Sequence, residues 1–373
     1  MRIAVIGNTP VNGGVAVAAD LALAGHEIAF APWPAEDAML APITARGGLE
    51  LTGATELSLA GKGGLAPVRL AGTLAEAVED VELVVLDVAA PDFERRFAEL
   101  LPVLPKDQLV LVNMHGYWPA LRLAPLLADA GRQDITISET IAPSHAAAYA
   151  DGVVELQWVR SRIPAAVFPA NRTAKAMETL LRAFPILAPA TNVLETGFAG
   201  LNMMIHFPLV LVNIGWCDRL EMTGQPVPLY LEGMTRHASN LVEAQDRERR
   251  IVCDAFAAPW KPLPTYLADL YDASGDTALD TVATTRYYRE LPPYPATAWQ
   301  RWMGWDIPNA YVPMVALADL AGVDVPLHRA AISLCSAFLQ TDLSQGVTLE
   351  RLRLGGLSVA QVNQYVETGL LPR

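Results

Sequence analysis

Cysteine is scarce in this chain, and the three cysteines that occur form no pattern. Cys217, Cys253 and Cys335 are odd in number and widely spaced along 373 residues. This spacing argues against a disulfide framework and against a zinc site, so we expect no bound metal. A protein without disulfides is typical of a reducing compartment, and we expect a cytoplasmic location.

Long apolar runs and excess positive charge are also lacking. The longest apolar stretch, from Met203 to Trp216, reads as too short to span a membrane and is interrupted by histidine, asparagine and proline. The first seven residues, MRIAVIG, resemble a buried β-strand rather than a signal peptide. The net charge of −13 disfavours nucleic acid and anionic membranes as partners. A small anionic substrate stays compatible with this charge, because a local arginine can dominate inside a cleft.

The chain is long enough for two domains, each with its own core. Hydrophobic residues make up 52% of it and charged residues 18%, a composition far from that of disordered proteins. Residues 1–190 alternate apolar strand segments with helical segments, which predicts a Rossmann-type α/β domain with a doubly wound parallel sheet. From residue 196 to 373, helical segments follow one another without strands, which predicts an all-α domain. The charged run at residues 246–250 is expected to form a solvated helix face.

The first strand leads into a glycine-rich turn and then a helix. Strand, turn, helix and second strand within about thirty residues form the βαβ unit that places a pyrophosphate at a helix N-terminus. The dinucleotide fingerprint GxGxxG would begin at Gly7, but the next glycines arrive late, as though two residues were inserted. We therefore expect a nicotinamide dinucleotide at this turn, with its seating altered by the expansion. The expected cofactor-binding residues are Gly7, Thr9, Pro10, Gly13 and Gly14.

The end of the second strand bears on which nicotinamide cofactor is used. An acidic residue there binds the ribose 2′-hydroxyl of NAD, whereas a nearby arginine accepts the 2′-phosphate of NADP. Here the strand ends with Ala31, Pro32 and Trp33, followed by Glu36 and Asp37, and no basic residue is close in the sequence. NAD or NADP is expected, with NAD slightly favoured.

Two polar clusters stand out in the apolar sequence of the second half. Asn202 and His206 are four residues apart in GLNMMIHFPLVLVNIGW, so they share one face of a helix. Arg301 and Asp306 lie in QRWMGWDIPNAYVP. A histidine that acts as acid or base needs an orienting carboxylate, and an arginine suits a substrate carboxylate. The combination predicts an enzyme that reduces a carboxylate-bearing substrate, although a core histidine and a surface arginine remain the simpler alternatives.

Several segments of the chain resemble the octopine/nopaline (opine) dehydrogenase family. The most specific are NMMIHFP and RWMGWDIP, whose order and separation both fit. The other matching segments are the amino-terminal strand with its NGG turn, GGLELTG, SETIAP, FPANRT, VNIG, YLEGMT, EAQDRERRIV and LERLRLGGLS. The family joins a nucleotide-binding domain to a helical domain and uses NAD(P)H to condense an amino acid with a 2-oxo acid such as pyruvate. The resemblance thus implies an oxidoreductase that acts on CH–NH bonds.

The resemblance also implies roles for the polar residues. His206 corresponds to the family's catalytic histidine and Asp306 to its carboxylate partner, while Arg301 corresponds to the arginine that holds the oxo-acid carboxylate. Asn202 fits the family pattern and would bind substrate beside them. The segment NMHGYW, which contains His115, departs from the glycine-rich loop more usual in the family. This departure leaves the identity of the substrate and the role of His115 open.

Two other functions stay open from the sequence. A 2-hydroxy-acid dehydrogenase or 2-oxo-acid reductase on the same fold could use the same histidine, aspartate and arginine. A non-catalytic NAD(H)-binding sensor would bind the cofactor without consuming it. The apolar helical half could also offer the surface of a homodimer, although an apolar helix face is equally a core face.

Overall fold

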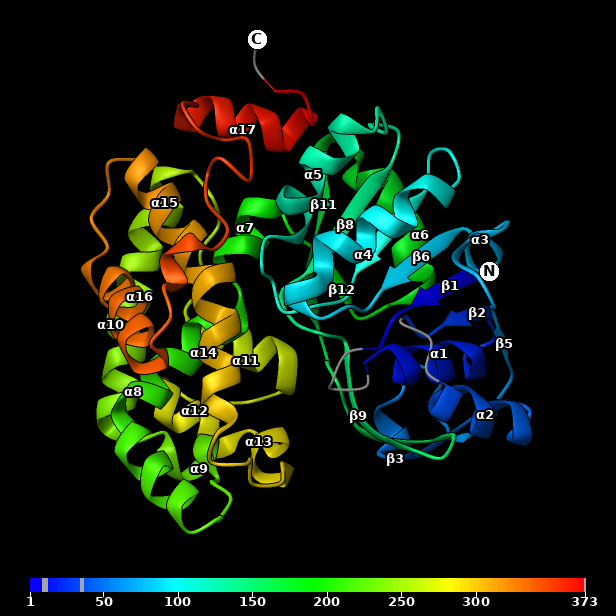
Figure 1. The fold of residues 1–373 in the computed structure, drawn as a ribbon, viewed down its shortest axis with the longest axis horizontal. Coiled ribbons are helices and arrows are strands. Elements are labelled where there is room, and N and C mark those ends of the chain that lie inside the picture. Colours follow the sequence, from blue (N-terminus) through cyan, green and yellow to red (C-terminus); the bar gives the residue numbers. More distant parts are fainter. Residues whose placement is uncertain (9–12, 34–36, 372–373) are drawn as a thin grey trace. The chain divides into compact units, whose positions relative to one another are not determined.

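The structure is a computed structural model, and it describes residues 1–8, 13–33 and 37–371. The chain divides into two compact units, which Figure 1 shows. The first, named here the sheet domain, comprises Met1–His115, Pro119–Val193 and Val366–Gly369. The second, named the helical domain, comprises Gly116–Trp118, Leu194–Tyr365 and the residues from Leu370 onward. The sequence did not indicate that residues 116–118 belong to the second unit.

An eight-stranded sheet forms the centre of the sheet domain. Its strands, in order across the sheet, are β12 (Leu187–Pro189), β11 (Ile163–Phe168), β8 (Thr136–Thr140), β7 (Leu109–Val112), β6 (Leu83–Leu86), β1 (Arg2–Ile6), β2 (Glu27–Ala31) and β5 (Val68–Leu70). β1 pairs in parallel with β2 and β6, so that Val5 lies opposite Phe30 on one side and Val85 on the other. β11 runs antiparallel to β8. The central strands are apolar and buried along nearly their whole length, as expected of a parallel sheet whose two faces are covered.

Helices follow the strands of this sheet along the chain. They are α1 (Gly13–Leu23), α2 (Asp37–Arg46), α3 (Leu74–Val78), α4 (Phe93–Leu100), α5 (Pro119–Asp129) and α6 (Thr173–Ala183). In the view of Figure 1, α4 lies in front of the sheet. The alternation of parallel strands and helices confirms the predicted Rossmann-type α/β class.

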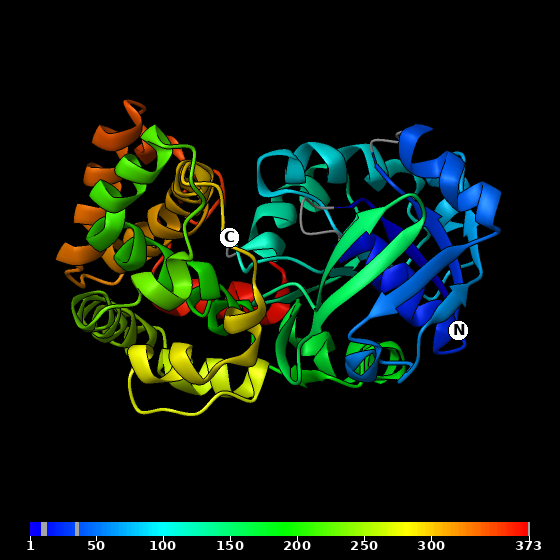
Figure 2. The ribbon, with the colours of Figure 1, turned by 90° about the horizontal axis from the view of Figure 1, so that it is seen from below.

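A second, smaller sheet packs against α1, and the sequence did not predict it. Its strands, in order, are β4 (Gly64–Ala66), β3 (Leu49–Gly53), β10 (Val153–Val159) and β9 (His145–Ala150). All four contact α1, and Figure 2 shows the long strands β9 and β10 beside it. α1 is therefore buried along nearly its whole length, which explains why its sequence has no polar face. A single sequence shows that these segments are extended but not which sheet each of them joins.

The helical domain confirms the predicted all-α half. Its helices are α7 (Val193–Phe198), α8 (Leu201–Met222), α9 (Leu229–Gly233), α10 (Arg236–Ala255), α11 (Leu263–Tyr271), α12 (Ala278–Thr284), α13 (Arg286–Glu290), α14 (Ala298–Asp306), α15 (Val312–Leu320), α16 (Pro326–Leu339) and α17 (Val359–Thr368), with a π-helical turn at Ile307–Tyr311. The first residue of α7 and the last turn of α17, from Val366, are counted with the sheet domain. Among the described residues of this half, β pairing is limited to an isolated bridge between Val227 and Tyr294.

Helix α8 is the long apolar core helix of this domain. In the described chain, Val193–Met222 is the one helical stretch long and apolar enough to cross a membrane by length and composition. The apolar segment is therefore longer than the sequence-based estimate of residues 203–216. However, 78% of its apolar window is buried inside the protein, and we interpret it as a core helix.

The charged run at residues 246–250 of α10 was predicted to be a solvated face, and this prediction is wrong for three of the five residues, whereas Arg247 and Arg250 are exposed. Arg249 is 1% exposed, and its Nε donates a hydrogen bond of 2.7 Å to Asp246. Glu248 lies 2.8 Å from Nδ1 of His328 and also accepts a hydrogen bond from the backbone N–H of Leu327. Opposite charges and backbone donors within the same domain offset the desolvation of these side chains, so part of the run enters the core.

Candidate active site

Asn202 and His206 lie one turn apart near the start of α8. Their four-residue spacing places both side chains on one face of the helix, as the sequence predicted. His206 is 4% exposed, and Asn202 is partly buried. A buried imidazole on an otherwise apolar helix requires polar partners. Three other segments of the helical domain provide polar or aromatic partners for these two residues.

Asp306, the last residue of α14, is the first of these partners. Its Oδ2 lies 2.7 Å from Nδ1 of His206, although the two residues are 100 positions apart. Because a carboxylate accepts hydrogen bonds, Nδ1 carries the proton and Nε2 is left as an acceptor. Trp302, one turn earlier on α14, stacks on the imidazole with 4.4 Å between the ring centroids. The carboxylate and the indole together fix the tautomer and the plane of the ring.

Tyr117 binds the other carboxylate oxygen of Asp306. Its buried hydroxyl donates a hydrogen bond to Oδ1 of Asp306 and accepts one of 3.2 Å from Nδ2 of Asn202. Asn202 was predicted to bind substrate, but the contact that the structure provides for its amide is this tyrosine. Sequence reasoning noted the segment NMHGYW only as a departure from the family pattern and did not identify Tyr117. The neighbouring His115 belongs to the sheet domain.

Tyr230 of α9 covers the remaining nitrogen of the imidazole. Its Oη lies 2.6 Å from Nε2 of His206. The phenol ring stacks on Tyr288 of α13, with 4.5 Å between centroids and an angle of 20° between the planes. Burial raises the pKa of the Tyr230 phenol well above its usual value, so the hydroxyl stays protonated near neutral pH. Sequence reasoning missed this residue, because nothing in the segment YLEGMT points to His206.

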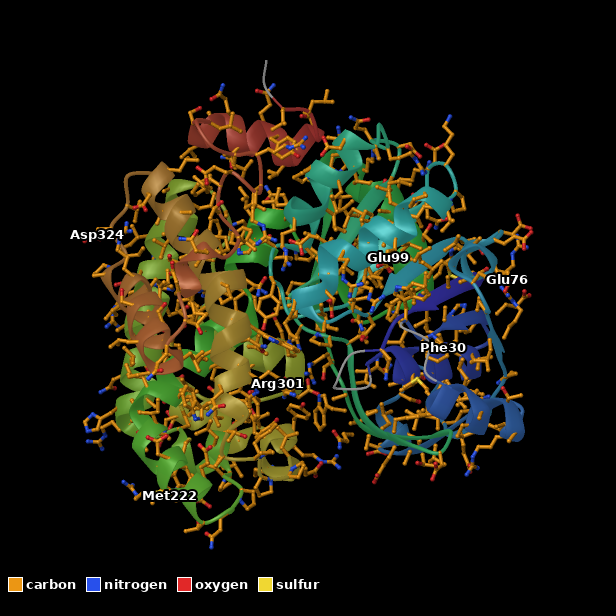
Figure 3. The ribbon with its side chains drawn as sticks, in the orientation of Figure 1. Phe30, Glu76, Glu99, Met222, Arg301 and Asp324 are labelled. Atoms are coloured by element: carbon orange, nitrogen blue, oxygen red, sulfur yellow. The ribbon has the colours of Figure 1, made fainter. Side chains whose placement is uncertain are left out.

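Arg301 lies on α14 but is exposed, and Figure 3 labels it. Its guanidinium lies over the Trp305 ring at 5.7 Å from the centroid. Within the described residues no ion pair of Arg301 is formed, and no hydrogen bond joins it to His206 or Asp306. The structure therefore does not bring Arg301 into direct contact with the histidine pair. An exposed arginine without a carboxylate partner keeps its five N–H donors available for a ligand.

The glycine turn after β1 is packed too tightly for side chains. A Cβ on Gly7, which has a φ of +90°, would lie 2.2 Å from the backbone oxygen of Asp87. A Cβ on Gly13 would lie 2.3 Å from Oδ2 of Asp87, and one on Gly14 would lie 2.1 Å from the oxygen of Gly7. α1 begins at Gly13, so the N–H groups of its first turn, which have no acceptor within the helix, lie beside Gly7 at the end of β1. This arrangement fits an anionic pyrophosphate at the helix N-terminus.

Two of the predicted cofactor-binding residues, Thr9 and Pro10, lie outside the described residues. Gly7, Gly13 and Gly14 are brought together by the close approach of β1, α1 and the residue after β6. Asn8 lies within the same turn, and its Oδ1 accepts a hydrogen bond of 3.3 Å from the N–H of Val15.

A basic residue lies near the end of β2, although none is close in the sequence. The guanidinium of Arg96, on α4, lies 5.5 Å from the centroid of the Trp33 ring. Glu99 accepts hydrogen bonds from both, at 2.9 Å from Nε1 of Trp33 and 3.2 Å from Nη1 of Arg96. Sequence reasoning missed Arg96 because α4 follows a different strand. Glu99 thus partly neutralises the charge of Arg96. This arginine lies near the end of β2, where the 2′ position of an adenosine ribose is expected.

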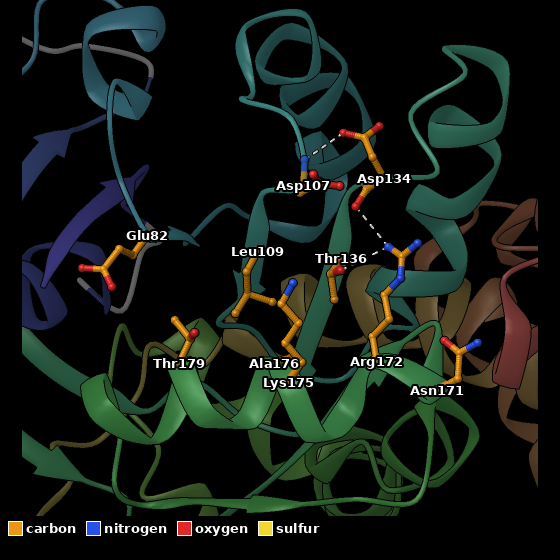
Figure 4. Close-up of a pocket in the computed structure, with 10 residues that line it drawn as sticks. All are labelled: Glu82, Asp107, Leu109, Asp134, Thr136, Asn171, Arg172, Lys175, Ala176 and Thr179. Carbon is orange, nitrogen blue, oxygen red and sulfur yellow. Dashed lines mark hydrogen bonds between the residues drawn. The ribbon is translucent and has the colours of Figure 1, made fainter.

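A separate cavity of about 390 Å³ lies at the ends of the main-sheet strands opposite the glycine turn, where β7 and β8 begin (Figure 4). Its lining residues include Leu109, Thr136 and Arg172, whose guanidinium donates to the backbone oxygen of Asp134. The carboxylate of Asp134 accepts hydrogen bonds from Arg132, which lower its pKa to about 2. The glycine turn follows the carboxyl end of β1, which runs parallel to β6 and β7. This cavity therefore lies at the amino ends of the strands, away from the edge where α/β sheets bind nucleotides.

Comparisons with known proteins agree with this fold. Residues 189–339 match the family model for the α-helical domain of NAD/NADP octopine/nopaline dehydrogenase. The opine dehydrogenase of Arthrobacter sp. is 28% identical over 358 residues, which cover 95% of this chain and 96% of that protein.

Solved structures share the fold over nearly the whole chain. Octopine dehydrogenase with NADH and L-arginine superposes with a TM-score of 0.76 at 18% identity, covering 100% of this chain and 99% of that one. Yersinopine dehydrogenase with bound NADP+ gives a TM-score of 0.66 at 15% identity, covering 98% and 97%. Sequence, domain match and fold agree: residues 189–339 match the α-helical domain of the octopine/nopaline dehydrogenase family, and the whole chain is similar to an opine dehydrogenase in sequence and to octopine dehydrogenase in fold.

Proposed function

We propose that this protein is an NAD(P)H-dependent opine dehydrogenase, which reductively condenses an amino acid with a 2-oxo acid such as pyruvate to give a secondary amine. The observation that carries the proposal is the buried pair of His206 and Asp306, at 2.7 Å, in a family of this activity. The relative from Arthrobacter is named an opine dehydrogenase, and the octopine dehydrogenase structures contain NADH with L-arginine or pyruvate.

The glycine turn is the proposed seat of the cofactor. Gly7, Thr9, Pro10, Gly13 and Gly14 would form the turn around the pyrophosphate, because side chains at the three glycines would clash with Asp87 or Gly7. Backbone N–H groups at the start of α1 would bind it, since Pro10 has no N–H and that of Gly7 donates to the backbone oxygen of Ala31 at 2.8 Å. When bound, the reduced nicotinamide supplies the hydride that converts an imine into a secondary amine. We favour NAD slightly over NADP, since Arg96, which lies against Trp33 just after β2, already donates a hydrogen bond to Glu99.

Arg301 and Asn202 are the proposed substrate-binding residues. The exposed guanidinium of Arg301 would bind the carboxylate of the oxo acid through two parallel hydrogen bonds. Holding the carbonyl carbon in place in this way can lower a barrier by up to about 7–11 kcal/mol. Asn202 would act beside it, directly or through Tyr117, to which its amide donates.

His206 is the proposed acid–base group, with Asp306 as its orienting partner. Condensation of an amine with a carbonyl requires one proton to leave the ammonium group and another to reach the departing oxygen. An imidazole held in one tautomer by a carboxylate can perform both transfers, which is typically worth about 10²–10⁴-fold in rate. Asp306 would stabilise the imidazolium that forms between them.

A substrate panel tests the proposal. NADH or NADPH oxidation is followed with pyruvate and related 2-oxo acids, with and without a set of amino acids. Consumption that depends on the amino acid supports the opine reaction, and His206→Ala should then abolish it while leaving cofactor affinity nearly intact. Consumption without any amine would identify a 2-oxo-acid reductase instead. Tight NAD(H) binding with no consumption under any mixture would identify a sensor.

A cytoplasmic location and a homodimer are part of the proposal. Cys217, Cys253 and Cys335 are buried as free thiols, which suits a reducing compartment. Exposed apolar side chains on the helical domain, among them Met222 and Val212, would suit a subunit interface. Light scattering during gel filtration measures the mass of the assembly, and fractionation of the host cell measures the location.

A further inference from the structure

Both ring nitrogens of His206 are occupied by groups of the protein itself. Nδ1 donates to Asp306 at 2.7 Å, and Nε2 lies 2.6 Å from the hydroxyl of Tyr230. One face of the ring is covered by Trp302. In this arrangement the imidazole has no free nitrogen with which to reach a substrate. A proton must either pass through Tyr230, or Tyr230 must leave its position.

Several aromatic rings hold Tyr230 where it is. Its ring stacks on Tyr288 at 4.5 Å, meets Tyr294 edge to face at 6.0 Å, and lies against Trp302 at 5.7 Å. Tyr288 and Trp302 are themselves buried. Moving the phenol out would break these contacts together with the hydrogen bond to His206. Aromatic pairs of this kind contribute about 0.5–1.5 kcal/mol each beyond their buried area.

We propose that the hydroxyl of Tyr230 is the group that exchanges protons with the substrate, and that His206 acts through it. The inference rests on the proposed function, and it assigns to Tyr230 the direct proton exchange with the substrate, which the pair of His206 and Asp306 alone does not provide. In the chain of contacts Asp306–His206–Tyr230, the phenol is the end that is not held by a further carboxylate.

The proton movements balance in both directions. When an amino acid's ammonium group is deprotonated, its proton moves to Oη of Tyr230 while the phenol proton moves to Nε2 of His206. The resulting imidazolium faces the carboxylate of Asp306. When the carbinolamine loses its hydroxyl group as water, the phenol proton moves to that oxygen and Nε2–H returns a proton to Oη. Tyr230 is a neutral phenol before and after each transfer.

The surroundings of the phenol suit this exchange. The rings around it, Tyr288 and Tyr294, are uncharged, and Tyr271 and Tyr287 lie beyond them. Burial raises the pKa of the phenol, so a phenolate does not accumulate and the two transfers must be concerted. Asp306, with Tyr117 on its other oxygen, is the charged group that the described residues place in hydrogen-bond contact with His206.

Tyr230→Phe tests the proposal because it removes one oxygen and keeps the ring that packs on Tyr288. We expect kcat of the condensation to fall by about 10²-fold or more, with the KM for the cofactor unchanged. The pH profile of kcat should differ from that of the wild type, and the solvent deuterium isotope effect should fall, since two protons no longer move together. Tyr311→Phe is the matched control. It loses a buried hydroxyl that donates 2.7 Å to the backbone oxygen of Met203, and it should keep the wild-type pH profile and isotope effect.

A measurement without turnover accompanies the kinetics. In nitrogen-15 NMR spectra, Nε2 of His206 should shift on Tyr230→Phe, as an acceptor that loses its donor, whereas Tyr311→Phe should leave it in place. An unshifted Nε2 resonance, or a Tyr230→Phe variant that keeps the wild-type kcat and pH profile, would overturn the relay while the proposed function stands. Absence of amine-dependent turnover in the wild-type protein would defeat the proposed function first, and the relay with it.

Discussion

The hydroxyl of Tyr117 donates its hydrogen bond to Oδ1 of Asp306, the oxygen that His206 does not use. The carboxylate is 1% exposed, so it cannot obtain a second donor from bulk water. Tyr117 is in turn held by the amide of Asn202. The pair of His206 and Asp306 is thus the centre of a longer chain of hydrogen bonds within one domain.

Tyr117→Phe should lower both activity and stability. Leaving a buried acceptor without its donor costs about 1–3 kcal/mol, which thermal unfolding measures. The freed carboxylate can rotate, so we also expect a lower kcat with an unchanged KM for the cofactor. Tyr149→Phe is the control, because its hydroxyl donates 2.9 Å to the backbone oxygen of Met39 in the sheet domain. Equal kinetics for both variants would show that Tyr117 does not position Asp306.

Arg301→Ala should raise the KM for the 2-oxo acid more than it lowers kcat. The side chain is exposed and forms no ion pair within the described residues, so stability should change by less than about 0.5 kcal/mol. Arg301→Lys should recover only part of the loss, since an ammonium cannot form two parallel hydrogen bonds to a carboxylate. Steady-state kinetics with the oxo acid varied measures both. A KM that does not move in either variant would refute the role of Arg301.

Gly13→Ala should weaken cofactor binding sharply. The new Cβ would lie 2.3 Å from Oδ2 of Asp87, whose side chain is buried, so either this carboxylate turns away from the turn or α1 shifts together with the N–H groups of its first turn. Gly215→Ala, inside α8 with no atom within 4 Å of the added Cβ, is the control. Titration of protein fluorescence with NADH and NADPH gives the affinity of each. If Gly13→Ala binds NADH and NADPH as tightly as the control does, the glycine turn is not the binding site of the cofactor.

Glu99→Gln should move the cofactor preference toward NADPH. Glu99 accepts hydrogen bonds from Arg96, Arg95 and Trp33, and it offsets the charge of Arg96 beside Trp33, just after β2. A neutral amide would leave that charge available for a 2′-phosphate. The measurement is the ratio of the KM values for NADPH and NADH. Glu82→Gln, which removes a surface ion pair with Arg182, should leave the ratio unchanged, and an equal effect of both variants would contradict the prediction.

Asp20→Asn should destabilise the sheet domain in a pH-dependent way. Burial alone would raise the pKa of Asp20, but the hydrogen bond from His145 and those from the backbone N–H groups of Leu59 and Ala60 lower it below its usual value. The ionised carboxylate therefore stabilises the fold above the unfolded pKa of about 3.9, and this stabilisation is lost as pH falls through the lower folded value.

Removing one partner of such a buried pair typically costs about 3–5 kcal/mol, which we expect for Asp20→Asn at pH 7. Urea unfolding between pH 3 and 7 measures the free energy of unfolding of the variant and of the wild type. The difference between these two free energies should become smaller below about pH 4. Asp80→Asn, at an exposed partner of Arg2, should cost less than about 0.5 kcal/mol at every pH. If the loss of unfolding free energy in Asp20→Asn stays constant with pH, the lowered pKa of Asp20 is contradicted.

The sequence predicts the parts of this protein that local pattern determines. The apolar strand before Gly7, the helix after Gly14 and the helical second half all follow from composition and period, because each element is specified by its own residues. The four-residue spacing of Asn202 and His206 likewise fixes their common face. The pairing of His206 with Asp306 could be anticipated only through the family resemblance, since no local rule joins residues 100 positions apart.

The remaining features depend on tertiary packing. Tyr117 lies in a loop, and Tyr230 lies on a helix of five residues. Neither has a periodic pattern that would mark it as a partner of the histidine pair. Arg249 was predicted to be solvent-exposed because charged residues usually are. In the structure it is buried, and Asp246 and the backbone oxygen of Lys261 accept its hydrogen bonds. The small sheet beside α1 was missed for the same reason, because strand partners are chosen across the chain.

The segment Gly116–Trp118 follows β7 along the chain, yet it is part of the helical domain. Trp118 is fully buried there, edge-on to Phe198 with 5.0 Å between the ring centroids, and a Cβ on Gly197 would lie 2.3 Å from its indole. Cutting the gene near residue 193 would therefore deprive the carboxy-terminal fragment of a core tryptophan and of the tyrosine on Asp306. A chimera that exchanges helical halves between relatives must transplant these three residues as well, or it will carry a gap in its hydrophobic interior.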